Sequence, residues 1–188
     1  MRNTILTITA FCALNFNTFS QKEIAGVKVP ETLKAGEKNL VLNGAGIREK
    51  FFLDLYVGAL YLETKKSTAS EIINADSHMA ITLHIISSLI DSEKMSSSTL
   101  EGFEKSTQGK TKPLEKEINQ FIAIFNREPI KVNDYYQLVY IPEKGVLVYK
   151  GNKLLDTIKG LEFKKALFGI WLCNNPADND LKTSMLGK

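Results

Sequence analysis

The chain has 188 residues, of which 44% are hydrophobic and 24% are charged, and this balance is typical of one soluble globular domain with a sizeable core. The formal net charge is only +3, and the sequence contains no block of like charge. The composition therefore gives no reason to expect nucleic acid or an anionic membrane surface as a partner.

Residues 1–20 have the pattern of a signal peptide. Arg2 is followed by a short apolar run, Ile5 to Leu14, which is too short to span a bilayer. Thr18 and Ser20 place small side chains at the −3 and −1 positions of a cleavage site before Gln21. We therefore predict a signal peptide over residues 1–20 and a mature domain over residues 21–188. The mature chain would be an exported, periplasmic protein without a transmembrane segment. The alternative is that the run forms a buried N-terminal strand.

Two short strands are predicted next, over Glu23 to Val29 and Asn39 to Leu42, with Pro30 between them. The stretch Leu42 to Glu63 then carries the strongest pattern in the chain. Asn43 to Gly46 predicts a glycine turn, which would also allow a neighbour to approach closely. Phe51 to Leu62 is apolar at both odd and even positions, which predicts a central strand covered on both faces.

Arg48 lies where the predicted turn meets this strand. Its guanidinium would offer a fixed fork of donors to a carboxylate or an enolate. The alternative is an ordinary surface arginine. If Arg48 is buried without a ligand, we expect an internal partner such as Asp54 or Glu49, because an unpaired buried charge is costly.

The middle of the chain alternates between helices and strands. Ser67 or Thr68 caps a predicted short helix that ends at Ile73, and a strand is predicted over His78 to Ile86. The two histidines of this strand, His78 and His84, share one face but lie about 20 Å apart. One metal ion could not bind both, and we predict neither a metal site nor a cofactor.

The second half is predicted to contain three helices, a strand meander and a short last helix. Asp91 or Ser92 caps a helix that ends near Lys105. Pro113 opens a helix whose apolar stripe is Ile118, Phe121, Ile122 and Phe125. The strands are predicted at residues 135–141, 145–150 and 153–158, and the final helices at residues 161–172 and from the Asp178 cap to Leu186. Strands and helices that are segregated in this way predict an α+β fold, with a mostly antiparallel sheet and helices packed on one face.

Two segments resemble the chalcone isomerase-like family. The first is G-A-G-x-R at residues 44–48, followed by a strand that ends in V-G-A-L-Y-L-E. The second is the helix Lys164 to Leu172 with Asn175-Pro176 and Asp180-Leu181-Lys182 after it, although Cys173 stands where the family usually has a glycine. The resemblance covers roughly Ile24 to Leu186 and implies the chalcone isomerase-like fold, an open-faced β-sandwich.

The resemblance also implies a role for Arg48, because the family's enzymes use the matching arginine to steady negative charge on the substrate. The enzymes' other polar positions differ here. Tyr56 replaces a threonine, residues 108–110 lack a tyrosine, and Ile170 replaces a polar residue. No general acid, general base or nucleophile is evident elsewhere in the sequence.

We therefore expect a non-catalytic binder of an apolar carboxylic acid of the fatty-acid type. Arg48 would hold the acid, and Tyr56, Gly44 and Gly46 would complete the site. Two alternatives stay open. One is an intramolecular lyase of the chalcone isomerase type, in which Arg48 is the catalytic residue. The other is an envelope scaffold that acts only through protein partners.

Overall fold

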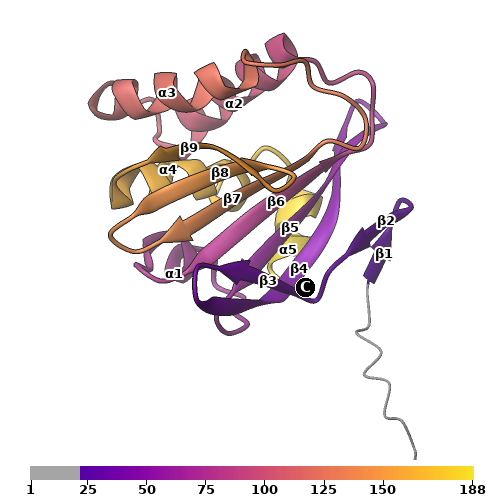
Figure 1. Cartoon of the computed structure of the whole chain (residues 1–188), viewed down its shortest axis with the longest axis horizontal. Coiled ribbons are helices and arrows are strands. Elements are labelled where there is room, and N and C mark those ends of the chain that lie inside the picture. The colour runs from indigo at the N-terminus through magenta and orange to yellow at the C-terminus, as the bar shows by residue number, and fades with distance from the viewer. Residues whose placement is uncertain (1–21) are drawn as a thin grey trace, which may run out of the picture.

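A seven-stranded sheet forms the frame of the domain (Figure 1). The structure is a computed structural model that describes residues 22–188, so the predicted signal peptide lies outside the described residues. The strands are β1 (Lys22–Ile24), β2 (Val27–Val29), β3 (Thr32–Ala35), β4 (Lys38–Lys50), β5 (Leu53–Leu62), β6 (Met79–Ile85), β7 (Tyr135–Ile141), β8 (Gly145–Lys150) and β9 (Lys153–Ile158). The helices are α1 (Ala69–Asn74), α2 (Ser92–Ser106), α3 (Glu115–Phe125), α4 (Leu161–Leu172) and α5 (Asn179–Met185), with a 3₁₀ turn, η1 (Lys112–Leu114), before α3.

The sheet runs in the order β3-β4-β5-β6-β7-β8-β9, and every pair of neighbours is antiparallel. Each strand therefore pairs with the strand next to it in the sequence. β1 and β2 form a separate two-stranded hairpin. The predicted α+β class and antiparallel sheet are confirmed, and β7, β8 and β9 have the predicted bounds.

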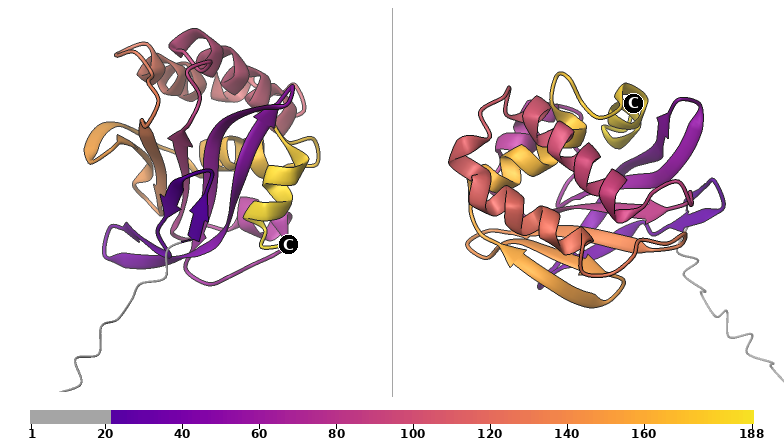
Figure 2. Two further views of the ribbon diagram at one scale, coloured as in Figure 1. Left: turned by 90° about the vertical axis from the view of Figure 1, so that its right-hand side faces the viewer. Right: turned by 90° about the horizontal axis from the view of Figure 1, so that it is seen from above.

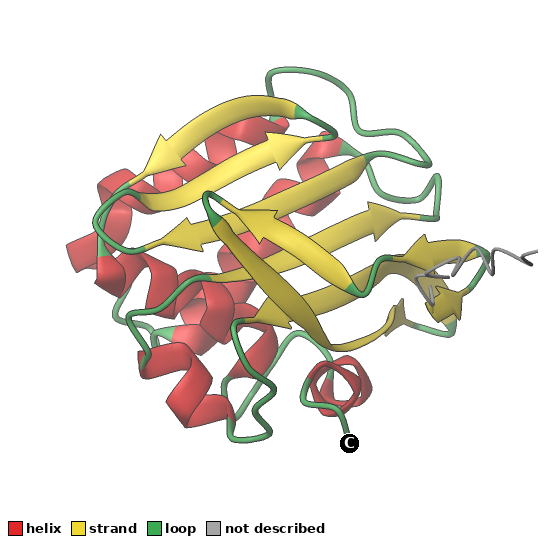
Figure 3. Cartoon of the chain, turned by 60° about the horizontal axis from the view of Figure 1, so that its bottom comes forward, coloured by secondary structure: helices red, strands yellow, loops and turns green. Residues whose placement is uncertain are grey.

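All the helices pack against one face of the sheet (Figure 2). Figure 3 shows the sheet from its other side, with the helices behind it. On β5, Tyr56, Leu60 and Leu62 face the helices, whereas Val57, Ala59 and Tyr61 face the opposite side. That opposite side is covered by apolar residues of β2, β3 and β4, including Val29, Leu33 and Leu40. The expectation that the central strand is covered on both faces is thus confirmed from Tyr56 onward.

The predicted glycine turn is wrong. Asn43 to Gly46 lies inside β4, and the chain turns instead at Phe51 and Phe52, whose φ angles are +52° and +62°. Two residues in the left-handed region form a tight hairpin turn, for which Asn-Gly is the usual sequence. Two phenylalanines give no such signal. For the same reason the predicted strand began too early, because Phe51 and Phe52 are not part of β5.

Smaller differences occur at the N-terminal end and before α3. The segment Glu23 to Val29 is a hairpin that turns at Ala25 and Gly26, both with positive φ. The strand β3 was not predicted, and Asn39 to Leu42 is part of the 13-residue β4. Pro113 opens the 3₁₀ turn rather than α3 itself. Within residues 22–188, no helix has the length and apolar character needed to cross a membrane.

Helix α4 packs most deeply, and it carries a buried lysine. The side chain of Lys164 is fully buried, and its Nζ donates hydrogen bonds to the carbonyl oxygens of Ile73 (2.7 Å) and Ala75 (2.5 Å). These carbonyls belong to the end of α1, so Lys164 ties α1 to α4. Burial lowers the pKa of Lys164 to about 8.

Candidate functional site

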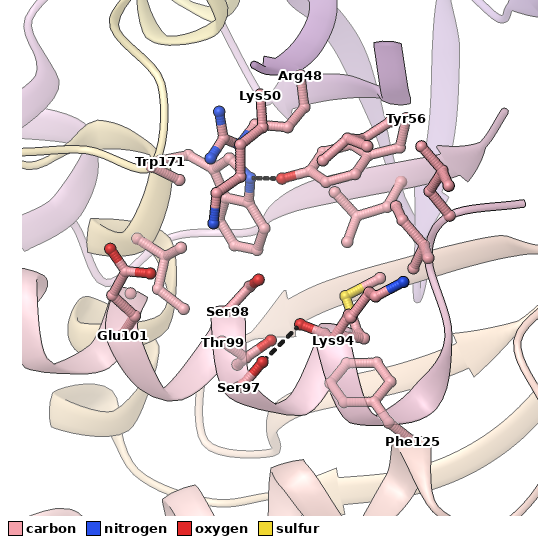
Figure 4. A pocket seen from close by; sticks show the side chains of 18 of the residues that line it. Arg48, Lys50, Tyr56, Lys94, Ser97, Ser98, Thr99, Glu101, Phe125 and Trp171 are labelled. Carbon is pink, nitrogen blue, oxygen red and sulfur yellow. Dashed lines mark hydrogen bonds between the residues drawn. The ribbon is translucent and has the colours of Figure 1, made fainter. Parts of the chain in front are cut away.

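A cavity of about 400 Å³ lies between the sheet and the helices (Figure 4). Its walls come from the β4–β5 hairpin, β6, α2, α3 and α4. Most of the inner wall is apolar and is formed by Leu55, Leu83, Met95, Phe121, Phe125 and Ile170. Phe121 and Phe125 belong to the apolar stripe predicted for α3, and both are buried. The cavity is thus an apolar chamber of the size that small-molecule ligands occupy.

Arg48 stands at one end of this cavity, near the end of β4, and faces Tyr56 across the β4–β5 pair. Its side chain is only 15% exposed. Nη1 lies 3.2 Å from Oδ2 of Asp178 and also donates to the backbone carbonyl of Glu49. Arg48 is therefore not an ordinary surface arginine. Its internal partner is Asp178, and neither the Asp54 nor the Glu49 carboxylate pairs with it among the described residues.

Asp178 has two roles at the start of α5. Its Oδ1 accepts hydrogen bonds from the backbone N–H groups of Asp180 (2.8 Å) and Leu181 (3.0 Å), so it is the N-cap. Its Oδ2 accepts from the Glu49 N–H (3.1 Å) and from Arg48. Burial alone would raise the pKa of Asp178, but these hydrogen bonds and the Arg48 charge lower it below its ordinary value. Asp178 is therefore held as a carboxylate.

This pairing leaves much of the Arg48 fork free. Both of its hydrogen bonds to described residues use Nη1, so Nε and Nη2 have no acceptor among residues 22–188. A guanidinium has five N–H donors in a fixed plane. Arg48 can thus keep Asp178 and still donate to a second anion.

Tyr56 lies beside Arg48 and is buried. Its hydroxyl accepts a hydrogen bond of 2.9 Å from Nε1 of Trp171 on α4, and Figure 4 shows both side chains at the Arg48 end of the cavity. Burial raises the pKa of Tyr56 above its ordinary value, although Trp171 and Arg48 act in the opposite direction. Tyr56 is therefore a neutral phenol near pH 7. No described residue accepts the hydrogen of its hydroxyl group, which is free to donate to a ligand.

Helix α2 supplies polar groups that the sequence analysis did not assign to a site. Ser97, Ser98 and Thr99 line the cavity, and so do Lys94, Glu101 and Lys105. The Lys105 ammonium lies 2.6 Å from Glu101 and lowers the pKa of that carboxyl, with smaller contributions from Lys50 and Arg48. The serine run at residues 96–98 was the available signal, because such residues are poor helix formers in the middle of a helix.

Gly44 and Gly46 do not line the cavity. A Cβ on Gly44 would lie 2.0 Å from the carbonyl oxygen of Ser184, and one on Gly46 would lie 2.7 Å from Cβ of Ser184. The close approach predicted for these glycines is real, but the neighbour is α5 rather than a ligand. Of the residues expected at the binding site, the structure brings Arg48 and Tyr56 together and places the two glycines elsewhere.

The two histidines lie apart from the cavity and from each other. His78 contacts the carboxylate of Glu63, and the ring of His84 packs against Tyr135. Across residues 22–188, the structure contains no group of three or more potential ligands that could hold a metal ion.

The fold and the cavity together define a class of protein: a curled antiparallel sheet with helices on one face, and an apolar chamber between them that ends at an arginine. The sequence model of the family described as chalcone isomerase-like matches residues 21–187, so the chain belongs to the chalcone isomerase-like family. No curated protein matches significantly. Among solved structures, the chain is similar to the crystal structure of a fatty-acid binding protein from Arabidopsis thaliana. That similarity has a TM-score of 0.67 and 18% identity, and it covers 86% of this chain and 92% of the plant protein.

Two of the three positions at which the resemblance implies other polar residues in the enzymes lie in the cavity wall. Tyr56 and Ile170 both line the cavity, so the threonine and the late-helix polar residue of the enzymes map onto its wall. Residues 108–110, where the enzymes have a tyrosine, do not line it. Of the polar groups that the resemblance implies for the enzymes, the cavity therefore keeps the arginine and has a phenol, Tyr56, in place of the threonine.

Proposed function

We propose that the protein binds an apolar carboxylic acid of the fatty-acid type and does not transform it. The observation that carries the proposal is the pairing of a partly unused Arg48 fork with the free Tyr56 hydroxyl at the end of an apolar cavity. A carboxylate at this point would receive charge-assisted hydrogen bonds from Arg48 and a further bond from Tyr56. The acyl chain would lie against Leu83, Phe121 and Phe125.

The electrostatics of the site suit an anion even though Asp178 is present. The Asp178 carboxylate also accepts hydrogen bonds from the N–H groups of Glu49, Asp180 and Leu181, so its negative charge is not stabilised by Arg48 alone. Arginine can contact two carboxylates at once through different nitrogen atoms. The fatty-acid binding protein of similar fold supports this choice of ligand.

We also propose that the protein acts outside the cytoplasm, in the periplasm. The support is the signal-peptide pattern of residues 1–20. Mass analysis of the folded protein from its own host should find an N-terminus at or near Gln21. An intact Met1 on that pool would contradict export.

The ligand proposal is tested first by native mass spectrometry and then by titration. Protein purified from its host envelope should carry a bound lipid or fatty acid. After this ligand has been removed, calorimetric titration with palmitate should show binding that Arg48→Ala weakens by at least about 1.5 kcal/mol, the scale of a charge-assisted hydrogen bond. The palmitate affinity of Arg48→Lys should lie between those of the parent and Arg48→Ala, because lysine keeps the positive charge but lacks the planar guanidinium donors.

Arg127→Ala is the matched control. Arg127 also pairs with a carboxylate, that of Asp156, but it does not line the cavity. Its loss should leave palmitate affinity unchanged. If Arg48→Ala lowers the stability of the domain while the fraction that stays folded keeps the parent's affinity for palmitate, then Arg48 serves only the structure and the proposed site is wrong.

The intramolecular lyase is tested by mixing the protein with a hydroxychalcone and following the loss of its visible absorbance. We expect no turnover above the spontaneous rate, because Ile170 is apolar and residues 108–110 do not line the cavity, so neither supplies the polar group that the resemblance implies for the enzymes. Turnover that disappears in Arg48→Ala would favour the enzyme. If the protein carries no ligand and binds none, the remaining hypothesis is an envelope scaffold that acts only through protein partners.

A further inference from the structure

The turn between β4 and β5 exposes two phenylalanines to solvent. Phe51 is 82% exposed and Phe52 is 95% exposed, which makes them the most exposed large apolar residues of the described chain. Leu53 on the same hairpin is 47% exposed, and Leu89, in the loop before α2, is 44% exposed. We call these four residues the apolar tip. A cluster of this kind on the surface is typical of a contact with another molecule or a membrane.

The backbone of the turn makes this placement more unusual. The φ angles of Phe51 and Phe52 lie in the left-handed region, at +52° and +62°. Residues with a Cβ are strained there, whereas glycine is not. Asn-Gly would serve the turn better. The two phenylalanines therefore neither suit the turn nor contribute to the core, and their use has to be sought outside the chain.

The apolar tip is continuous with the cavity. Phe51, Leu53 and Leu89 all belong to the cavity lining, together with Leu55 and Ile90 further in. An apolar molecule could thus pass from the tip into the cavity along apolar side chains. Of the four residues of the apolar tip, only Phe52 is not part of the lining.

The cationic side chains beside the tip are paired, with one exception, whereas the exposed carboxylates of Glu49 and Asp54 on the same hairpin have no basic partner among residues 22–188. Arg48, Lys94 and Lys105 contact Asp178, Asp91 and Glu101, respectively. Lys50, immediately before the turn, has no carboxylate partner among residues 22–188, and its Nζ lies 5.8 Å from the centre of the Phe51 ring. A lysine next to exposed aromatic rings can keep its ammonium at the headgroups while the rings enter the apolar region. The small net charge of the chain means that insertion, rather than long-range attraction, would dominate.

We propose that the apolar tip inserts into the interfacial region of a phospholipid bilayer, with Lys50 at the lipid phosphates. The mouth of the cavity would then face the membrane, so that an apolar acid could move between bilayer and cavity without crossing water. This exchange step rests on the proposed function, whereas membrane docking does not.

The test is flotation of the purified domain with vesicles of phosphatidylethanolamine and phosphatidylglycerol. The variant Phe51→Asn/Phe52→Gly should lose vesicle binding by at least about tenfold, because burial of each phenylalanine contributes strongly to insertion. The same variant should unfold at a higher urea concentration, since Asn-Gly suits the turn. Misfolding could then not explain the loss. Leu154→Ser is the matched control: Leu154 is 49% exposed on the edge strand β9, with three strands between it and β5, and its loss should not change flotation.

Insertion of the tip can be measured directly with the variant Phe52→Trp and vesicles that contain brominated lipids, which quench tryptophan fluorescence. The fluorescence of this variant should be quenched beyond that of the parent, whose one tryptophan, Trp171, is buried. Absence of flotation by the parent, or equal flotation of the Asn-Gly variant, would overturn the proposal. A parent that dimerises without vesicles, and becomes monomeric in the Asn-Gly variant, would also overturn it, since the tip would then contact a second copy. The two proposals can fail independently, because flotation tests membrane docking and palmitate titration tests ligand binding.

Discussion

Gly44→Ala should be among the most damaging single-methyl changes in this protein. The added Cβ would lie 2.0 Å from the backbone oxygen of Ser184 and 2.9 Å from that of Met185. Neither atom can move as the end of a flexible side chain would, so α5 itself has to shift away from β4. Asn43 would move out of place as well, because its side-chain amide donates to the Met185 carbonyl at 2.7 Å.

The magnitude follows from what α5 buries. Leu181, Met185 and Leu186 are at most 6% exposed, and complete loss of their burial would cost roughly 5–9 kcal/mol, at about 1.5–3 kcal/mol each. A partial shift is less costly, and overpacking of a core usually costs 1–3 kcal/mol, sometimes more. We therefore expect Gly44→Ala to lower the free energy of unfolding by at least about 3 kcal/mol, a large part of the stability of a typical domain.

Urea denaturation provides the measurement, and Gly26→Ala is the control. Gly26 has a φ of +75° but nothing within 4 Å of the added Cβ. The substitution Gly26→Ala should therefore lower the free energy of unfolding only by the backbone strain of the left-handed region, about 1–2 kcal/mol. Palmitate affinity should also fall in Gly44→Ala, because Asp178 begins α5 and holds Arg48. A loss of stability no greater than that of Gly26→Ala would refute the reasoning.

Three further predictions concern the buried polar groups. Trp171→Phe should lower palmitate affinity and cost about 1 kcal/mol of stability, because the Tyr56 hydroxyl loses the hydrogen bond donated by Trp171 Nε1. A calorimetric titration and a urea melt measure the two effects, and no change in either would contradict the prediction. The pKa of Asp178 is lowered in the folded state, so its contribution to stability is present above the unfolded pKa of about 3.9 and is lost as the pH falls through the folded value. Asp178→Asn should therefore show a shallower loss of stability in acid than the parent. The pKa of Lys164 is lowered to about 8, so the unfolded state binds more protons above that pH and stability should rise from about pH 8 toward pH 10. Lys164→Met should remove that rise, and an unchanged rise would show that another group causes it.

The parts of the fold that local chemistry dictates could be predicted from the sequence. The strands β7 to β9 are separated by turn residues, Pro142 after β7 and Gly151-Asn152 between β8 and β9, and α4 is bounded by Gly160 and by Pro176 beyond its end, so their limits agree with the structure. Asp91 and Asp178 were also identified as helix caps, and both side chains accept the expected backbone bonds.

The parts that failed depend on contacts between distant segments. Asn43 to Gly46 has the composition of a turn, but its glycines are required by α5, about 140 residues later. Phe51-Phe52 has the composition of a strand, yet it forms the turn because β4 and β5 pair on either side of it. Arg48 and Tyr56 could be proposed from the family resemblance, whereas Asp178 and Trp171 could not be assigned as their partners, because only the folded chain brings them close.

The order of the strands has a consequence for how the domain is assembled. Because each strand of the large sheet pairs with its neighbour in the chain, most of the sheet can grow hairpin by hairpin, at a small entropic cost for each loop closed. The return of α5 to β4 is different, since it joins segments from opposite ends of the domain. During synthesis on the ribosome, Trp171, Ala177 and Asp178 emerge after all the strands of the sheet, and all three are needed to close the Arg48 end of the cavity. The chamber is therefore finished only after α5 has been made, and a chain that stops before α5 would have a sheet without a working pocket.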